Sequence, residues 1–185
     1  SSISGHKFDD RNANGKWDPE SYVTAPPIIL VPPGSVVLPP NDDQSTALLN
    51  FGFTFEFFGN SYNGFYINNN GNVTFEGLLY SFSPQGFPQM TPIVAPFWAD
   101  VDTNGFGSVH LASGTSIRGN PFVQVDWVNV GYYFMNIDKL NNFTLYIEDD
   151  PGGDIVAFAY HDMQWTTGDM DGFGGFSGQG AQIGF

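Results

Sequence analysis

Apolar and polar positions alternate along the chain after Asn50, most clearly from Phe51 to Phe57, where phenylalanine takes every second position. Successive side chains of a β-strand point to opposite faces, so this alternation predicts a strand whose phenylalanines line one face of a sheet. Runs of the same kind predict further strands at residues 65–68, 73–76, 93–97, 108–112, 122–129, 143–148 and 155–160.

Turn-forming pairs separate these runs, among them Asn63-Gly64, Asn70-Gly71 and Asn104-Gly105. No stretch keeps a helical period for more than one or two turns. The pattern therefore predicts an all-β fold, an antiparallel and jelly-roll-like β-sandwich.

The chain before this pattern divides into two segments of different composition. Residues 1–22 are polar, whereas residues 23–50 contain six of the 13 prolines. Paired prolines exclude helix and favour extended backbone. The sequence thus predicts three parts: a calcium-binding loop segment at 1–22, an extended proline-rich arm at 23–50 and a β-sandwich domain at 51–185.

The arm carries two apolar runs that are unusual for a solvated connector. Such residues prefer a half-buried pleated surface, so both runs are expected to pack as short strands. One partner is the edge of their own domain, where proline is tolerated. The other is the sheet of a neighbouring copy. We expect at least one run to mediate assembly with another copy; the residues are Ile28, Ile29, Leu30, Val31, Val36, Val37 and Leu38.

Residues 10–20 contain the oxygen-rich spacing of a calcium loop. Such a loop takes ligands at its first, third, fifth, seventh and ninth positions, with glycine at the sixth for the sharp turn. Gly15 meets the glycine requirement, whereas the closing carboxylate comes one residue early, because Ser21 stands at the twelfth position. The alternative is a simple Asn/Asp/Gly turn. The predicted ligands are Asp10, Asn12, Asn14, Lys16 through its carbonyl, Asp18 and Glu20.

A second candidate for calcium follows a predicted buried strand. Asp100 and Asp102 lie two residues apart and would point to the same side of a continuing strand. Two adjacent carboxylates need a cation or hydrogen-bond donors, so the pair predicts either a metal ligand set or hydrogen bonds to the turn at Asn104 and Gly105. Asp169 and Asp171 offer a weaker pair of the same kind.

The net charge and the absence of cysteine disfavour several classes of partner and exclude sites that need cysteine. Five Lys and Arg against 19 Asp and Glu give a net charge of −14, which disfavours nucleic acid and anionic membranes as partners. With no Cys there is no disulfide, thiolate zinc site or cysteine nucleophile, and a cysteine-free extracellular protein suggests a bacterial source. No run approaches the ~18 apolar residues of a membrane span, so no membrane insertion is expected.

No arrangement of residues predicts catalysis. The histidines, His6, His110 and His161, are scattered, and no G-x-S-x-G motif is present. Paired carboxylates of a glycan hydrolase remain the enzymatic alternative. Asn72 and Asn142 begin N-glycosylation sequons, but both fall in or beside predicted strands, which leaves their modification open.

Two resemblances add to this picture. The opening from Ser4 to Asp10, with the following Asn/Gly loop and Trp17-Asp18, resembles the start of the calcium-binding B-type repeats of bacterial adhesins. Residues 51–185 resemble the nidogen-type extracellular domain, and the resemblance implies a non-catalytic domain of matrix and adhesion proteins. Its motifs are Phe57-Phe58-Gly59, Tyr66-Ile67-Asn68-Asn69-Asn70-Gly71, Ile93-Val94-Ala95-Pro96-Phe97-Trp98-Ala99-Asp100-Val101-Asp102, Gln164-Trp165-Thr166-Thr167-Gly168 and Ala181-Gln182-Ile183-Gly184-Phe185.

Together these features predict an extracellular or cell-surface, non-enzymatic structural or adhesive protein that calcium stabilises. Its expected partners are other copies of itself, joined into a fibre through the arm, or extracellular matrix and surface components. The alternative is a ligand-binding adhesion domain displayed on a larger bacterial surface protein.

Overall fold

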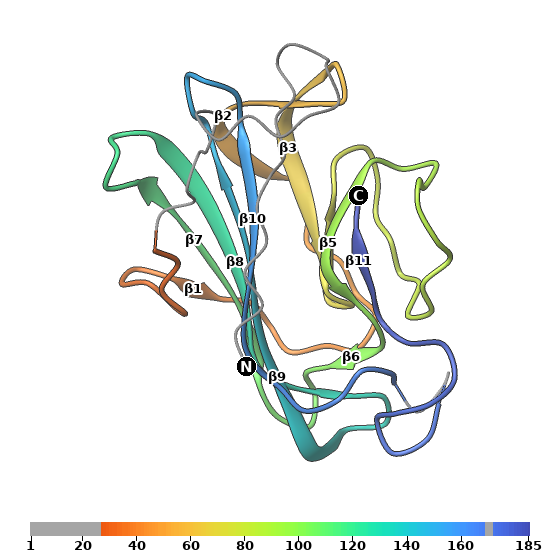
Figure 1. Ribbon diagram of the computed structural model, residues 1–185. Coiled ribbons are helices and arrows are strands. Elements are labelled where there is room, and N and C mark those ends of the chain that lie inside the picture. Colours follow the sequence, from red (N-terminus) through yellow and green to blue (C-terminus); the bar gives the residue numbers. More distant parts are fainter. Residues whose placement is uncertain (1–26, 169–171) are drawn as a thin grey trace, which may run out of the picture.

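A computed structural model describes residues 27–168 and 172–185, which form two antiparallel sheets packed as a sandwich (Figure 1). No helix occurs among these residues, so the predicted all-β sandwich is confirmed. The six-stranded sheet runs β1-β7-β8-β9-β10, with β6 paired to β8, and the five-stranded sheet runs β11-β5-β4-β3-β2. The first sheet contains β1 (Val36–Val37), β6 (Val101–Asp102), β7 (Ser108–Thr115), β8 (Pro121–Tyr132), β9 (Asn136–Glu148) and β10 (Ile155–Met163). The second contains β2 (Leu49–Phe57), β3 (Asn60–Asn68), β4 (Asn72–Thr74), β5 (Ile93–Trp98) and β11 (Gln182–Gly184).

The alternating phenylalanines of β2 face the space between the sheets, as predicted. Phe51 and Phe55 are buried, and Phe53 and Phe57 are partly buried against the same core. Phe51 also packs on Phe65 of β3, with ring centroids 4.5 Å apart. Aromatic burial of this kind supplies much of the free energy of folding.

The centre of the sandwich is aromatic on the side of the six-stranded sheet as well. Trp127 of β8 stacks on Phe143 of β9 with ring centroids 5.0 Å apart, and both side chains are fully buried. The Trp127 indole N–H donates to the carbonyl of Asn69 at 2.9 Å, which satisfies the buried donor. This bond joins β8 to the turn between β3 and β4 in the opposite sheet.

The chain passes from one sheet to the other between β1 and β2, between β5 and β6, and between β10 and β11, and the first two of these passages lie close together. The first passage is the loop from β1 to β2, which includes Asn41, and the second is the link from β5 to β6, which includes Asp100. Thr103 ties them, because its backbone N–H donates to the Asn41 carbonyl at 2.9 Å. Both crossings therefore meet at one end of the sandwich.

The predicted assembly residues lie on their own domain in this single copy. Val36 and Val37 form β1, an edge strand that pairs with Leu111 and His110 of β7, and Leu38 packs on the core. This is the intramolecular alternative for the second apolar run. The first run, Ile28, Ile29, Leu30 and Val31, forms no strand on its own domain, so the prediction of an intramolecular strand there is wrong, and pairing with a neighbouring copy stays a prediction.

Candidate metal centre at the sheet crossings

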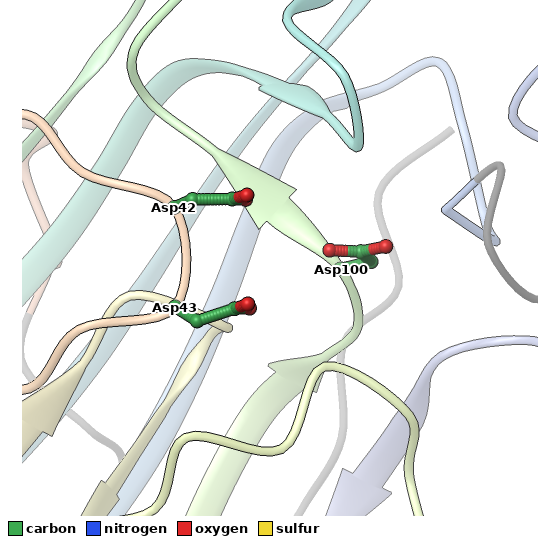
Figure 2. Close-up of side chains that lie close together, drawn as sticks. All are labelled: Asp42, Asp43 and Asp100. Atoms are coloured by element: carbon green, nitrogen blue, oxygen red, sulfur yellow. The ribbon is translucent and has the colours of Figure 1, made fainter.

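Three carboxylates from the two crossings point toward a common space (Figure 2). Asp42 and Asp43 come from the loop before β2, and Asp100 from the link between β5 and β6. One oxygen atom of each lies within 4.8 Å of those of the other two. Asp100 is only 2% exposed, so at least one of these charges lies away from bulk water. Oxygen ligands at this spacing suit a hard divalent cation such as calcium.

Asparagines of the β3–β4 turn hold the two crossings together. The Asn69 amide nitrogen donates to the carbonyls of Asn41, Asp42 and Val101 at 3.0, 2.6 and 2.6 Å. Asn70 donates to an Asp43 carboxylate oxygen at 2.9 Å and accepts from the Val101 N–H at 2.9 Å. The side chains of this turn thus position the acidic cluster on both of its sides.

Burial and like charge disfavour the ionised form of Asp42. The pKa of its carboxyl rises from 3.8 to about 6, first because of burial and then because of the charges of Asp102 and Asp43. Its Oδ1 atom is buried and accepts no hydrogen bond from the residues that the structure describes. A buried carboxylate oxygen without a donor is what a cation would satisfy.

Asp102 has a different role from Asp100, although the sequence pairs them. Its two carboxylate oxygens accept the backbone N–H groups of Asn104 at 2.8 Å and Met135 at 2.9 Å. Asp102 thereby joins the turn after β6 to the turn between β8 and β9. The turn interpretation fits Asp102, and the metal interpretation fits Asp100, whose neighbours in the cluster are Asp42 and Asp43.

Asp42 and Asp43 could not be recognised as site residues from the sequence. They stand in the proline-rich segment, and only the fold brings them to Asp100, more than 50 positions along the chain. The ligands predicted for the first calcium loop, from Asp10 to Glu20, lie outside the described residues, as do Asp169 and Asp171.

Both glycosylation sequons point inward in the folded protein. Asn72 is fully buried and Asn142 nearly so. The Asn142 amide exchanges hydrogen bonds with Asn129, donating to its Oδ1 at 3.0 Å and accepting from its backbone N–H at 2.8 Å. A glycan on either amide nitrogen is incompatible with this packing.

The histidines of the described residues take part in ordinary polar contacts on the six-stranded sheet. His110 Nε2 lies 2.8 Å from Ser108 Oγ, and His161 Nε2 lies 3.5 Å from Thr144 Oγ1. Asp162, beside His161, accepts a hydrogen bond from Gln164 at 2.7 Å. Among residues 27–168 and 172–185, no helix has the length and apolar character needed to cross a membrane.

The comparisons with known proteins agree with the sequence motifs. The model of the nidogen-like domain family matches residues 63–185. Human alpha-tectorin is 30% identical over 173 residues, which cover 80% of this chain and 8% of that protein. Mouse alpha-tectorin is 28% identical over 173 residues, which again cover 80% of this chain and 8% of that protein. Drosophila melanogaster nidogen is 28% identical over 166 residues, which cover 76% of this chain and 12% of that protein. No solved structure matches.

The family match covers well over half of the chain, whereas the chain spans only 8% to 12% of the length of these relatives. Alpha-tectorin and nidogen are extracellular matrix proteins and not enzymes. The chain belongs to the nidogen-like domain family, and its location is extracellular or at the cell surface, as the sequence predicted.

Proposed function

We propose that this chain is a non-enzymatic structural or adhesive module of the extracellular space, and that calcium stabilises it. The observation that supports calcium is the approach of Asp42, Asp43 and Asp100 within 4.8 Å at the sheet crossings. Family membership supports the structural role, since the relatives are matrix proteins.

A cation in this cluster would act as a link between the two sheets. Asp42 and Asp43 belong to the crossing before β2, whereas Asp100 belongs to the crossing after β5. A divalent ion bound by both crossings neutralises their mutual repulsion and resists separation of the sheets. Because the ion binds the folded chain and not the unfolded one, its binding free energy adds to the free energy of unfolding.

The test is a thermal unfolding titration with calcium, with magnesium as the comparison ion and a chelator as the starting state. We expect calcium to raise Tm, since a ligand at 100 times its Kd contributes about 2.7 kcal/mol. Magnesium should raise Tm less, because it requires near-octahedral geometry and keeps its water.

Two variants separate this cluster from the predicted N-terminal calcium loop. Asp43→Asn should abolish most of the Tm increase, whereas Asp10→Asn should change the number of bound ions without removing the increase. Asp154→Asn, outside the cluster, is the charge-matched control. A Tm that calcium leaves unchanged in the unmodified chain would refute the calcium part of this proposal.

The remaining question is whether the module is displayed on a larger protein or polymerises by itself. Display is supported by the small share of the relatives that this chain spans and by the packing of β1 on its own sheet. Self-assembly into a fibre and a bacterial origin stay predictions from the sequence. Negative-stain imaging of the full chain with and without chelator distinguishes filaments from separate particles, and a glycan panel tests the hydrolase alternative.

A further inference from the structure

The arm lies on the outer face of β8, where two side chains of β8 form hydrogen bonds with the backbone of the arm. Gln124 Nε2 donates to the Ile29 carbonyl at 2.8 Å, and the Val31 N–H donates to Asp126 Oδ2 at 3.2 Å. Gln124 and Asp126 are both buried. Asp126 is itself held by Thr144, whose hydroxyl donates to Oδ1 at 2.5 Å. The docking site is therefore preorganised and binds the main chain of an extended segment.

Val31 is strained at the point where the arm leaves this site. Its φ is +52°, in the left-handed region that β-branched residues rarely adopt. It also precedes Pro32, and a residue before proline favours extended backbone. Such strain persists only where the surrounding contacts impose it.

The chain then reverses to reach β1 through a tight turn. The Ser35 N–H donates to the Pro32 carbonyl at 3.2 Å, and Gly34 takes a φ of +88°. The strained valine and this turn together fold the arm back onto its own domain. Ile29, Val36 and Val37 on the two sides of the turn remain 65%, 62% and 56% exposed.

We propose that the arm exchanges between two copies of the chain, with residues 28–31 of each copy docked on Gln124 and Asp126 of the other. The φ torsion of Val31 is a rotation about its N–Cα bond, so it can change while the N–H group stays in place. The hydrogen bond from this N–H to Asp126 therefore persists while φ returns to the extended region. The turn at residues 32–35 opens, and the two connecting segments run antiparallel about a twofold axis.

The free-energy balance of this exchange depends on a few terms. The docking contacts are the same within one copy and between copies, so they favour neither state. Opening relieves the strain at Val31 and lets the two connecting segments cover Ile29, Val36 and Val37. Repulsion between two chains of net charge −14 opposes association, and salt screens it. The inference rests on the structural role proposed above, to which it adds the partner.

The test uses the full chain at near-physiological salt. Unlabelled and isotope-labelled populations are mixed, native mass spectrometry detects mixed-label dimers, and sedimentation velocity measures the dimer dissociation constant. Val31→Gly removes the strain in the closed copy, so it should raise this constant by about tenfold for each of the two hinges. Val31→Ile, which stays β-branched, should leave it unchanged.

A second pair of variants tests the docking site. Gln124→Ala removes the hydrogen bond to Ile29 from the closed copy and from the dimer alike, so it should lower Tm but leave the dissociation constant unchanged, whereas Gln85→Ala, on an exposed loop, should change neither. Melting curves verify that each variant is folded. A full chain that stays monomeric at every concentration, or a dimer that Val31→Gly does not weaken, would overturn arm exchange. Calcium-dependent Tm is independent of this readout, so a monomer that calcium stabilises refutes the exchange alone.

Discussion

Asp42 is the residue at which burial and charge conflict most directly. Its carboxylate lies beside Asp43 and Asp102, and its Oδ1 atom has no donor among the described residues. Asp42→Asn removes this repulsion, so we expect it to raise the free energy of unfolding of the calcium-free chain at neutral pH by about 1 kcal/mol. Urea unfolding in chelator measures the change. The same variant should lose most of its response to calcium, and a stability loss in chelator would contradict this account.

The pH dependence of the calcium-free chain follows from the same residue. The folded pKa of Asp42, about 6, lies above the unfolded value of 3.8, so between these values the folded state holds the proton more tightly. The contribution of Asp42 is thus most stabilising below the unfolded pKa and is lost as pH rises through the folded pKa. We expect Asp42→Asn to make the free energy of unfolding depend less on pH between 3.8 and about 6, and to leave its pH dependence above this window the same as in the unmodified chain. Urea unfolding in chelator at a series of pH values measures this.

Met135 lies in a turn whose backbone does not suit it. Phe134 and Met135 have φ of +63° and +57°, values that Asn or Gly usually take in a hairpin turn, and the Met135 side chain is 54% exposed. Met135→Gly should stabilise the protein by about 0.5–1 kcal/mol, since relief of backbone strain exceeds the entropy that glycine adds to the unfolded chain. Chemical denaturation tests this, with the fully exposed Met90→Gly, which has no such φ, as the control that should give no gain.

At the scale of elements, the turn between β7 and β8 is attached to the end of β9 chiefly by the ion pair of Arg118 and Glu148, beside which Arg118 also lies 3.8 Å from Asp150. Arg118 donates from Nε and Nη2 to the two carboxylate oxygens of Glu148 at 3.1 and 2.9 Å, and Glu148 is fully buried. Burial alone would raise the pKa of Glu148, but hydrogen bonds from Arg118, Tyr146, Asn120 and Ser116 outweigh it and lower the pKa. The carboxylate is therefore charged inside the protein.

Arg118→Met leaves that charge without its cation, so we expect a loss of about 3–5 kcal/mol in the free energy of unfolding at neutral pH. The loss should shrink in acid, because the stabilisation from a lowered pKa disappears as pH falls through the folded pKa. Lys139→Met is the matched control, since its partner Asp138 is largely exposed and such pairs contribute at most about 1 kcal/mol. Equal losses for the two variants would refute the difference in burial as the cause.

The elements that the sequence predicted are those whose pattern is local. The Phe alternation of β2 and the runs of β8, β9 and β10 each carry enough residues to show a period of two. β6 and β11, of two and three residues, are too short to show a period and escaped prediction, whereas the equally short β1 and β4 were predicted from their apolar composition. Residues 28–31 were expected to pair as a strand from their composition, whereas buried side chains of β8 bind their backbone instead.

At the scale of the whole molecule, the candidate site depends on where two distant crossings meet. The sequence identified Asp100 and Asp102 from their spacing. Spacing alone could not show that Asp100 belongs to the acidic cluster whereas Asp102 joins two turns. Asp42 and Asp43 stand in a segment that composition assigns to a connector. Their role arises only when the two sheets pack, because Asn69 and Asn70 then bring both crossings to one place.

Asn69 is the side chain on which this junction most depends. Its buried amide nitrogen donates to three carbonyls, two from the first crossing and one, that of Val101, from the second. Asn69→Ala removes one donor from each of these carbonyls, and only that of Asn41 keeps a described bond, from the Thr103 N–H, so we expect a loss of about 2–3 kcal/mol in the free energy of unfolding.

Asn63→Ala provides the comparison for Asn69→Ala, because Asn63 is exposed on β3 and accepts a hydrogen bond from Thr54 alone among its described contacts. Its loss should stay within about 0.5 kcal/mol. Since Asn69 also places Asp42 and Val101, Asn69→Ala should weaken the calcium response in the same melts. A variant that is destabilised but keeps the full calcium response would show that the carboxylates hold their positions without the asparagine, and that the two crossings are joined independently of it.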